Sequence, residues 1–203
     1  MDMVTELNME NTAHSPAEQS GQRKKLHPHK FTLWVAIASM LMMFAGLTSA
    51  FIVKSNMVGW RDVRMPEIFL VSTAIMIGSS ITIQMAVRSF KQRNMSAYRY
   101  LVAATLVLGV TFVILQVMGF NILWNQNIRF DGSAGAAQFL YIIFGLHGIH
   151  VLGGVIALIV MFFKTFVGKI KTYSPVGIEV AATYWHFVDI LWLYLLVFFL
   201  IIG

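Results

Sequence analysis

Five long apolar segments dominate the pattern of hydrophobic and polar positions along this chain. Each is long enough to cross the roughly 30 Å hydrocarbon core of a bilayer as a helix rising about 1.5 Å per residue. All four prolines lie outside these segments, and no segment alternates polar and apolar residues as a barrel strand would. The pattern therefore predicts an all-α membrane protein, a bundle of five transmembrane helices. The expected helices cover residues 31–53, 68–87, 101–124, 134–163 and 180–202.

The first 30 residues differ from the rest, because they are polar and carry four acidic and four basic side chains. They contain no apolar run long enough for the core of a signal peptide. A segment of this composition buries too little apolar surface to order itself. We therefore expect residues 1–30 to be a disordered tail and residues 31–203 to form the transmembrane domain.

The lysine and arginine residues that flank the apolar segments predict the orientation of the bundle. Eleven of them fall in the N-terminal tail and in the second and fourth loops, whereas four fall in the first and third loops. The positive-inside rule places the richer side in the cytoplasm. The N-terminus is therefore expected to be cytoplasmic and the C-terminus periplasmic. The richer side has Arg23, Lys24, Lys25, Lys30, Arg88, Lys91, Arg93, Arg99, Lys164, Lys169 and Lys171, and the other side has Lys54, Arg61, Arg64 and Arg129.

Composition narrows the chemistry that this chain can support. Hydrophobic residues make up 58% of the chain, charged residues make up 12%, and the mean hydropathy is +0.72, which is far from the balance of a soluble globule. Cysteine is absent, which excludes thiolate-ligated metals, iron–sulfur clusters and disulfides. The basic residues behind the formal charge of +6 sit in short loops, where they set topology and contact anionic lipids. We therefore expect no nucleic-acid partner.

Ionisable side chains inside the apolar segments are the candidates for function. His186 and Asp189 lie in the segment 180–202, and a charged side chain at the centre of a membrane costs about 2.5 to 3.5 kcal/mol. His147 and His150 lie in the preceding segment, three residues apart and therefore on one helix face. Because the fourth and fifth helices are expected to be antiparallel neighbours, we expect an imidazole of the fourth to reach the carboxylate of Asp189.

Three functions fit this set of residues. Histidines on facing helices can hold a haem, although the two closest histidines here lie on the same helix. Histidine and aspartate at mid-membrane are also the usual parts of a proton or ion pathway in a stand-alone carrier. The third function is a structural network that joins the fourth and fifth helices, with Glu179, His186 and Asp189 in one stripe of the fifth. Residue spacing favours the structural network and leaves the other two functions open.

Two sequence motifs carry a resemblance to a known family. The fourth segment contains HGIHVLGG, Gln116 lies toward the end of the third, and Glu179 precedes YWHFVDILWL in the fifth. In this order and spacing, these residues resemble subunit III of the haem–copper terminal oxidases, the cytochrome c and quinol oxidases. The resemblance runs from about residue 31 to the end of the chain. It implies the five-helix form found in many bacteria, a multi-pass protein of the bacterial inner membrane.

The resemblance also implies that the redox chemistry takes place on other chains. Partner subunits I and II are expected to hold haem and copper, reduce oxygen to water and pump protons, while this chain binds neither metal nor haem. This chain is expected to stabilise subunit I and to bind structural phospholipid. Whether the complex joins a larger respiratory supercomplex is left open. Whether cytochrome c or quinol donates the electrons is left open. The matching positions, implied as structural, lipid or subunit contacts without a catalytic role, are His147, His150, Glu179, Tyr184, Trp185, His186 and Asp189.

Two positions depart from the pattern of this family. Many members carry an acid after a serine in the first common helix, where this chain has Met40 after Ser39. A second acid usually follows the glutamine of the third helix, where this chain has Gly119 in QVMGF. A role of those carboxylates in proton movement is therefore not carried over to this chain.

Overall fold

The computed structural model describes residues 28–55, 66–125, 135–166 and 176–202. These residues form five α-helices, each long and apolar enough to cross a membrane, which confirms the predicted class and number of spans. The predicted tail lies outside the described residues except for residues 28–30, which begin the first of these helices. The helices are α2 (Pro28–Ser55), α3 (Ile68–Lys91), α4 (Met95–Asn125), α5 (Gly135–Phe166) and α6 (Val176–Ile202).

All five helices extend beyond the apolar segments that predicted them, at one end or at both. α2 begins at Pro28, a residue whose fixed φ and missing N–H suit the first turn of a helix. α4 begins at Met95, because the side chain of Asn94 accepts a hydrogen bond from the Ala97 amide (3.2 Å) and caps the first turn. The prediction ended most segments next to a charged residue. Long basic side chains such as Lys91 can instead reach the membrane surface while their helix continues.

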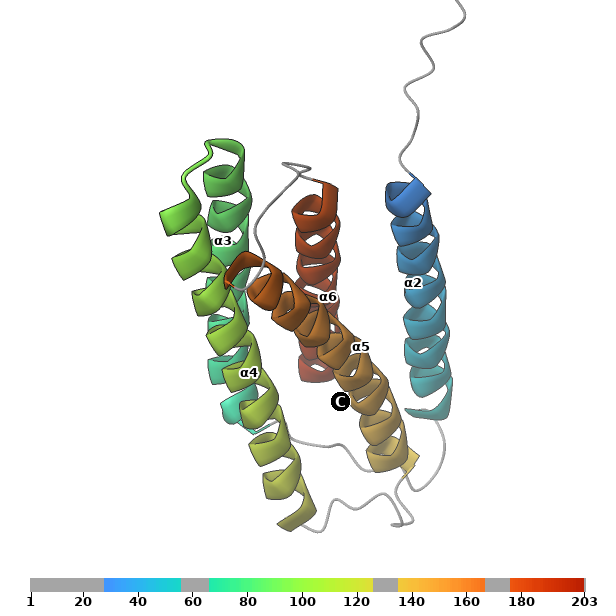
Figure 1. Ribbon diagram of the computed structural model, residues 1–203. Coiled ribbons are helices and arrows are strands. Elements are labelled where there is room, and N and C mark those ends of the chain that lie inside the picture. The colour runs from blue at the N-terminus through green and yellow to red at the C-terminus, as the bar shows by residue number, and fades with distance from the viewer. Residues whose placement is uncertain (1–27, 56–65, 126–134, 167–175, 203) are drawn as a thin grey trace, which may run out of the picture.

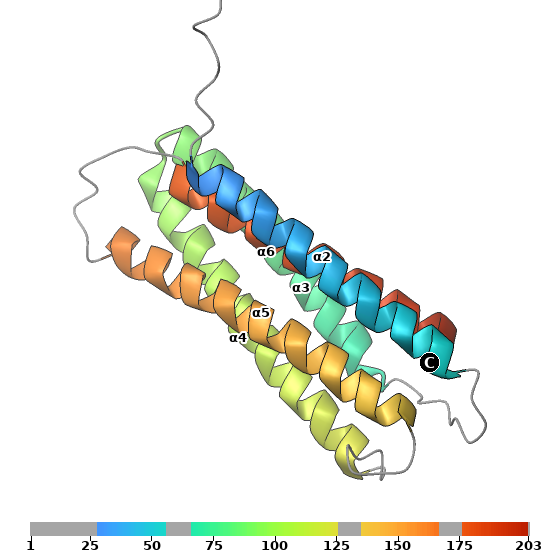
Figure 2. The same ribbon diagram turned by 90° about the vertical axis from the view of Figure 1, so that its right-hand side faces the viewer.

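The five helices pack as a bundle in which α6 contacts α2, α3 and α5. Figure 1 shows α3 and α4 on one side, α2 on the other, and α5 crossing in front of α6 between them. Figure 2 shows α2 lying along α6. α3 and α4 form the most extensive pair and run antiparallel, since Thr82 hydrogen-bonds Thr105 (2.9 Å) and Gln116 donates to Ser72 (3.1 Å). Because α6 contacts three other helices, the candidate residues on α6 can bind partners on α2, α3 and α5.

The indole of Trp185 fills the space where four helices meet. Its Nε1 donates a hydrogen bond to Ser79 Oγ of α3 (2.9 Å), and only 1% of the residue is exposed. A Cβ atom at Gly109 of α4 or at Gly154 of α5 would lie 2.9 Å from ring atoms of this indole. Glycine at both positions therefore lets α4 and α5 approach the ring closely, as small residues do in membrane helix packing.

A second indole, that of Trp192, repeats this attachment two turns further along α6. Its Nε1 donates to Thr73 Oγ1 of α3 (2.9 Å). The ring packs on Phe112 and Phe144, with centroids 5.4 and 5.3 Å apart, distances at which aromatic pairs attract one another. α6 is thus joined to α3 by two buried indole hydrogen bonds, and aromatic packing surrounds the second of them.

The two positions that lack the family acids are both occupied by apolar packing. Phe69 of α3 lies against Gly119, so that a Cβ atom at position 119 would lie 2.8 Å from its ring. Phe69 is fully buried and its ring meets those of Phe144 and Trp192, which leaves it little room to move. Met40 is also buried, with 8% exposure. A glutamate at position 119 would have to displace the Phe69 ring, which gives a physical reason for the glycine.

Candidate functional site

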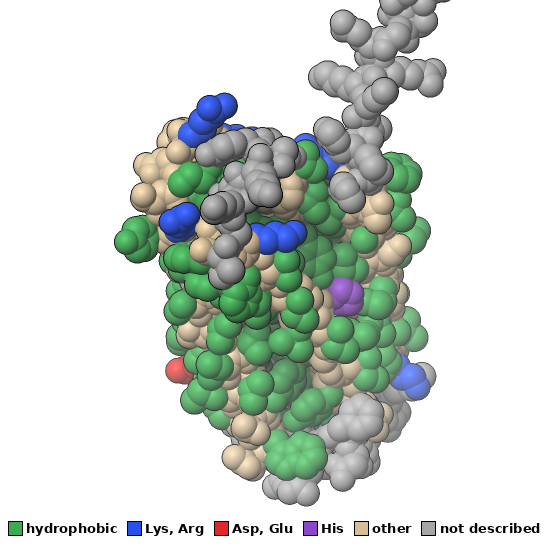
Figure 3. Space-filling model, in the orientation of Figure 1, with side chains coloured by type: hydrophobic (Ala, Val, Ile, Leu, Met, Phe, Trp, Pro, Cys, Tyr) green, Lys and Arg blue, Asp and Glu red, His purple; other side chains and the backbone are tan. Residues whose placement is uncertain are grey.

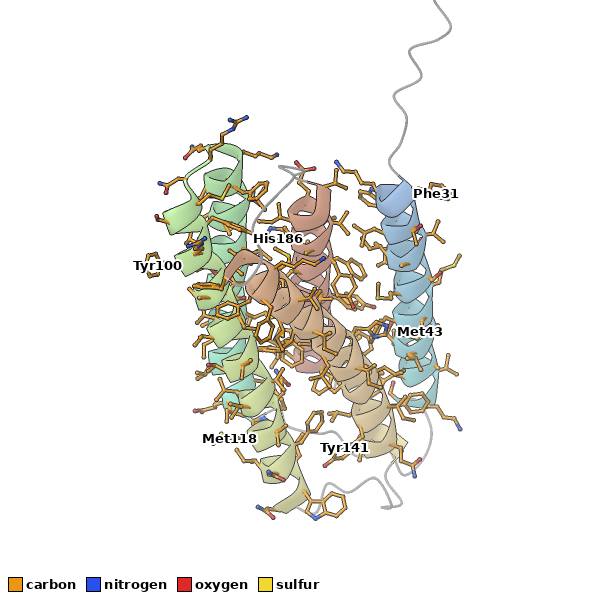
Figure 4. All side chains as sticks on the ribbon, in the orientation of Figure 1. Phe31, Met43, Tyr100, Met118, Tyr141 and His186 are labelled. Carbon is orange, nitrogen blue, oxygen red and sulfur yellow. The ribbon has the colours of Figure 1, made fainter. Side chains whose placement is uncertain are left out.

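The predicted site residues lie along α6 and on α5, and several of the partners come from α2 and α3. Figure 4 shows His186 in the upper half of the bundle between α3 and α6. In Figure 3, hydrophobic side chains cover the middle of this face, and most of the Lys and Arg side chains gather toward the end where α2 and α6 begin. The polar residues of α6 thus run from a charged end of the molecule into an apolar interior.

Glu179, in the first turn of α6, forms a charge cluster at that end. Its carboxylate pairs with Lys30 Nζ of α2 (2.8 Å) and with Lys91 Nζ of α3 (2.9 Å). The lysine side chains are 42% and 56% exposed, and exposed pairs of this kind contribute up to about 1 kcal/mol each. The cluster therefore ties the ends of three helices together weakly, with partners that the sequence prediction did not assign.

His186 is hydrogen-bonded to α3 through both of its ring nitrogens. Nδ1 lies 2.5 Å from Ser80 Oγ, and Nε2 lies 3.2 Å from Oε1 of Gln84. An amide oxygen only accepts hydrogen bonds, so Nε2 carries the proton and Nδ1 accepts from the serine hydroxyl. A neutral imidazole therefore satisfies both contacts, and its partners belong to α3 rather than to α5.

The predicted contact between an imidazole of α5 and the carboxylate of Asp189 is wrong. His147 is 2% exposed and Asp189 is 5% exposed. Within the described part of the chain, neither ring nitrogen of His147 and neither carboxylate oxygen of Asp189 has a hydrogen-bond partner. The ring of Trp192 lies on the α5 side of α6 and stacks on His147, with centroids 5.3 Å apart. Asp189, one turn earlier, instead lines a groove beside α3, where the hydroxyl of Ser80 is the polar group next to its carboxylate.

These unsatisfied groups cost stability. In the described residues, the four atoms of His147 and Asp189 are the buried side-chain nitrogens and oxygens without a partner. Leaving a buried polar group unpaired costs about 1 to 3 kcal/mol, and more if it is charged. Two buried ionisable side chains are thus left without complete hydrogen bonding among the residues that the structure describes.

His150 and Tyr184 join α5 to α6 through the backbone. The hydroxyl of Tyr184 donates to the carbonyl oxygen of His150 (2.9 Å). Nδ1 of His150 donates in turn to the carbonyl oxygen of Leu146 (2.7 Å), because a carbonyl oxygen can only accept. The imidazole also meets the ring of Phe44 of α2 edge-on, with centroids 5.9 Å apart. Three helices therefore meet at His150, and its imidazole serves packing there.

A groove of about 450 Å³ lies between α3 and α6 and is lined by Asp189. A smaller pocket of about 330 Å³ adjoins it, shares Gln84 and His186 with it, and reaches Glu179. Together they form a polar line from the charged end to the midpoint of α6. The polar side chains of the groove are Thr73, Ser80, Gln84, Arg88, His186 and Asp189, and its apolar side chains include Ile77, Ile81, Met85, Ile190 and Leu193.

A larger cavity of about 640 Å³ lies on another side of α6, between α5 and α6. Most of its lining is apolar, from Leu33 of α2 to Val160 of α5 and Ile178 of α6. Lys164 supplies the one charged side chain among the described residues that line it. An apolar cavity that ends at a basic side chain has the form of a site for an acyl chain with an anionic head group.

Metal ligands do not gather at any of these places. In residues 28–55, 66–125, 135–166 and 176–202, no group of three or more His, Asp or Glu side chains is placed to hold a metal ion. His186 uses both ring nitrogens in hydrogen bonds, and the ring of His147 is enclosed by Trp192 and Phe44. His147, His150 and His186 are thus engaged in contacts with other residues of the bundle.

The sequence marks Thr73 and Ser79 as small polar residues able to form hydrogen bonds between helices, but sequence reasoning did not pair them with the two indoles. Thr73 and Ser79 of α3 are buried and receive the hydrogen bonds of Trp192 and Trp185. A signal was available, because these residues lie six apart on a helix that is rich in small polar side chains, and the tryptophans lie seven apart on α6. On antiparallel helices, such similar spacings allow two pairs to form together.

The fold and these contacts define a class: a five-helix membrane protein whose buried polar side chains mainly join its helices. A family model described as cytochrome c oxidase subunit III matches residues 2–203. The chain belongs to the cytochrome c oxidase subunit III family, which confirms the resemblance seen in its motifs.

Curated relatives carry the same description. A probable cytochrome c oxidase subunit 3 of Nocardia farcinica is 29% identical over 94% of this chain and 95% of the relative. One of Mycobacterium leprae is 32% identical over 78% of this chain and 80% of the relative. One of Rickettsia prowazekii is 35% identical over 68% of this chain, and the match spans about half, 49%, of that longer relative. The similarity thus extends over nearly the whole length of some relatives and over half of others.

Proposed function

We propose that this chain is the non-redox subunit III of a bacterial cytochrome c oxidase, a multi-pass protein of the inner membrane. The family match over residues 2–203 carries this proposal. Partner subunits I and II hold the haem and copper, reduce oxygen to water and pump protons. This chain packs against subunit I and stabilises it, and takes no part in electron transfer.

The distribution of basic side chains supports a cytoplasmic N-terminus and a periplasmic C-terminus. All described Lys and Arg residues except Lys54 lie at the end of the bundle where α2 and α6 begin. Basic residues are enriched on the cytoplasmic side of membrane proteins. The Glu179 cluster, with Lys30 and Lys91, then lies at the cytoplasmic surface.

In this proposal, four polar side chains of α6 form hydrogen bonds or ion pairs that join α6 to its neighbouring helices. Glu179 binds α2 and α3, Tyr184 binds α5, and Trp185 and His186 bind α3. Each of these side chains finds its partner on another helix. This use of the polar groups supports a structural subunit and leaves none of them free for redox chemistry.

Structural phospholipid completes the proposal. The cavity between α5 and α6 offers apolar walls for an acyl chain and Lys164 for a phosphate group. An ordered lipid in this cavity would fill space between α5 and α6 and so stabilise their packing. Lipid extraction of the purified complex, followed by mass spectrometry, measures this directly, and Lys164→Glu is expected to reduce the amount of anionic lipid retained.

Purification of the tagged chain from native membranes tests the proposed function. In mild detergent the chain is expected to co-purify with a larger haem-bearing subunit, and the complex is expected to consume oxygen with reduced cytochrome c as donor. After dissociation, the isolated chain is expected to show no Soret absorption band. A stoichiometric haem on the isolated chain would contradict the proposal, and activity with quinol in place of cytochrome c would assign the subunit to a quinol oxidase.

A further inference from the structure

Ser80 of α3 lies between two ionisable side chains of α6. Its Oγ lies 2.5 Å from Nδ1 of His186, and its hydroxyl is also the polar group next to the carboxyl group of Asp189. Asp189 stands at the midpoint of α6, and Ser80 stands next to the midpoint of α3. The three side chains therefore form a row, in the order aspartate, serine, histidine, at the middle of the two helices.

The hydrogens available to this row bear on the protonation state of Asp189. Nε2 of His186 donates to Oε1 of Gln84 (3.2 Å), so Nδ1 carries no hydrogen and accepts the one hydrogen that the Ser80 hydroxyl can donate. Ser80 then has only acceptor capacity left. The carboxyl oxygens of Asp189 have no partner with the geometry of a hydrogen bond among the described residues. A carboxylate anion would thus find no donor at this place.

The surroundings of Asp189 also favour its protonated form. A charged side chain at the centre of a membrane is costly unless it is paired. Among the described residues that line the groove, the other charged side chain is that of Arg88, which lies about 12 Å along α3 from Ser80. On the α5 side, the imidazole of His147 stacks on the indole of Trp192. Neither neighbour pairs with the carboxyl group, so burial favours the neutral acid.

Two adjoining pockets give this row access to the charged end of the molecule. The groove of about 450 Å³ and the smaller pocket of about 330 Å³ share Gln84 and His186, and the smaller pocket extends to Lys30, Lys91 and Glu179. A water molecule takes up about 30 Å³ in the liquid, so both pockets have room for water. His186 therefore stands between a space that water can enter and the buried acid.

The far half of α6 offers no continuation of this route. Beyond Asp189, the polar side-chain atoms of this helix are Trp192 Nε1 and the Tyr194 hydroxyl, which are hydrogen-bonded to Thr73 and Thr48 (2.9 and 2.8 Å). The remaining side chains of that half are apolar. The row thus opens toward one end of the molecule, which suits a binding site and not a channel.

We propose that Asp189, Ser80 and His186 form a proton-binding site that exchanges one proton with water at the end of the molecule where α2 and α6 begin. In the loaded state, Asp189 carries the proton. This inference goes beyond the proposed function and does not depend on it, because the site consists of residues of this chain alone.

Release of the proton needs no group from outside the chain except water. When the carboxyl group of Asp189 rotates toward Ser80, its proton passes to the Ser80 oxygen while the Ser80 hydrogen passes to Nδ1 of His186. The hydrogen on Nε2 then leaves to water in the smaller pocket. The products are a carboxylate, an intact serine hydroxyl and a neutral imidazole, so one proton has left, and the reverse steps load the site again.

Infrared spectroscopy of the full-length chain, in a detergent without ester groups, tests the site. At neutral pH the unchanged chain is expected to show the C=O stretching band of a protonated carboxyl group, and the band is expected to shift in D₂O because the carboxyl hydrogen exchanges with solvent. Asp189→Asn is expected to lack this band, whereas the control Glu179→Gln retains it. The inference is overturned if the unchanged chain lacks the band, if the band does not shift in D₂O, or if Asp189→Asn retains it.

Ser80→Ala tests the route of exchange, because it removes the hydroxyl between the acid and the imidazole. The shift of the carboxyl band after mixing with D₂O is expected to be at least about tenfold slower than in the unchanged chain. Ser89→Ala, on the same helix but outside both pockets, should exchange at the unchanged rate. Circular dichroism shows whether each variant keeps its helix content.

Equal exchange rates in Ser80→Ala and the unchanged chain would overturn the inference. Failure of the proposed function gives a different result, since the tagged chain would then purify without a haem-bearing subunit while the carboxyl band of Asp189 and its exchange in D₂O stay as described.

Discussion

Two carboxylates on the same helix, Glu179 and Asp189, are in opposite situations. Glu179 lies in the first turn of α6 and is held by lysines from α2 and α3. Asp189 lies at the midpoint of α6 and is buried, and its carboxylate oxygens have no partner that meets the geometry of a hydrogen bond among the described residues. Water can replace the lysines at the helix end, so that pairing is cheap to lose, whereas the mid-membrane carboxylate has no such substitute. Depth along the helix, rather than residue type, sets how much a missing partner costs.

The two tryptophans of α6 and His147 of α5 also differ in whether their buried polar groups are hydrogen-bonded. Trp185 and Trp192 each donate a hydrogen bond to α3. His147 stacks on Trp192, and neither of its ring nitrogens has a hydrogen-bond partner in the described helices. Removing a satisfied group should therefore weaken the isolated chain, and removing an unsatisfied one should not.

The largest effect is expected for Trp185→Ala. This change removes the hydrogen bond to Ser79 and empties the space that Gly109 and Gly154 leave for the indole. Loss of a large buried aromatic side chain costs about 3 to 5 kcal/mol. The loss of stability is measured by thermal unfolding of the isolated chain in detergent, monitored by circular dichroism.

Trp34→Ala is the matched control for that variant, because Trp34 is 63% exposed. Its unfolding midpoint in detergent is expected to change little. Equal losses at Trp185 and Trp34 would show that the indole of Trp185 does not hold the four helices together.

Glycine-to-alanine changes at two helix positions should differ in sign. A Cβ at Gly119 meets the ring of the buried Phe69 at 2.8 Å, whereas a Cβ at Gly78 meets nothing within 4 Å. Gly119→Ala is expected to destabilise by about 1 to 3 kcal/mol through overpacking. Gly78→Ala is expected to be neutral or to stabilise by up to about 1 kcal/mol, since alanine favours the helix. A stabilising Gly119→Ala would remove the explanation given for the missing family acid.

His147→Phe is expected to leave stability unchanged or to raise it by about 1 to 3 kcal/mol. The substitution keeps a ring against Trp192 and eliminates two unsatisfied nitrogens. The comparison is His186→Phe, which removes two hydrogen bonds to α3 and should lower stability. The unfolding midpoints of the two variants are measured side by side, and a larger loss for His147→Phe than for His186→Phe would contradict the contrast.

The smallest effect is expected for Glu179→Gln. The ion pairs with Lys30 and Lys91 involve half-exposed lysines, so their loss should cost about 1 kcal/mol or less. Salt screens such pairs, so the difference from the unchanged chain should shrink further between low and high ionic strength. A loss of stability several times larger than this, or one independent of salt, would contradict the account. It would show that the ion pairs are shielded from water, although their lysines are half-exposed.

The sequence predicted the fold well because membrane spans leave a strong one-dimensional signal. Length and apolarity alone located all five helices, and the motifs identified the family. Helix ends were less well predicted, because charged residues such as Lys91 continue a helix when their side chains can reach the surface.

The pairing of the candidate residues was only partly predictable. Sequence order suggested that α6 would pair its polar groups with α5, but His186 and both tryptophans bind α3. Which side of α6 faces which neighbour depends on the close approaches that Gly109 and Gly154 permit, and these are set by packing across four helices. Periodicity along one helix does not contain that information.

The free energy of unfolding of the isolated chain, with and without Asp189→Leu, tests the account most directly. Because Asp189 has no partner within the described part of the chain, the account predicts that the variant is as stable as the unchanged chain or more stable by about 1 to 3 kcal/mol. Asp189→Ala serves as a smaller variant that avoids overpacking. A loss of more than about 1 kcal/mol in both variants would contradict the account, because it would show that the carboxylate completes its bonding inside this chain.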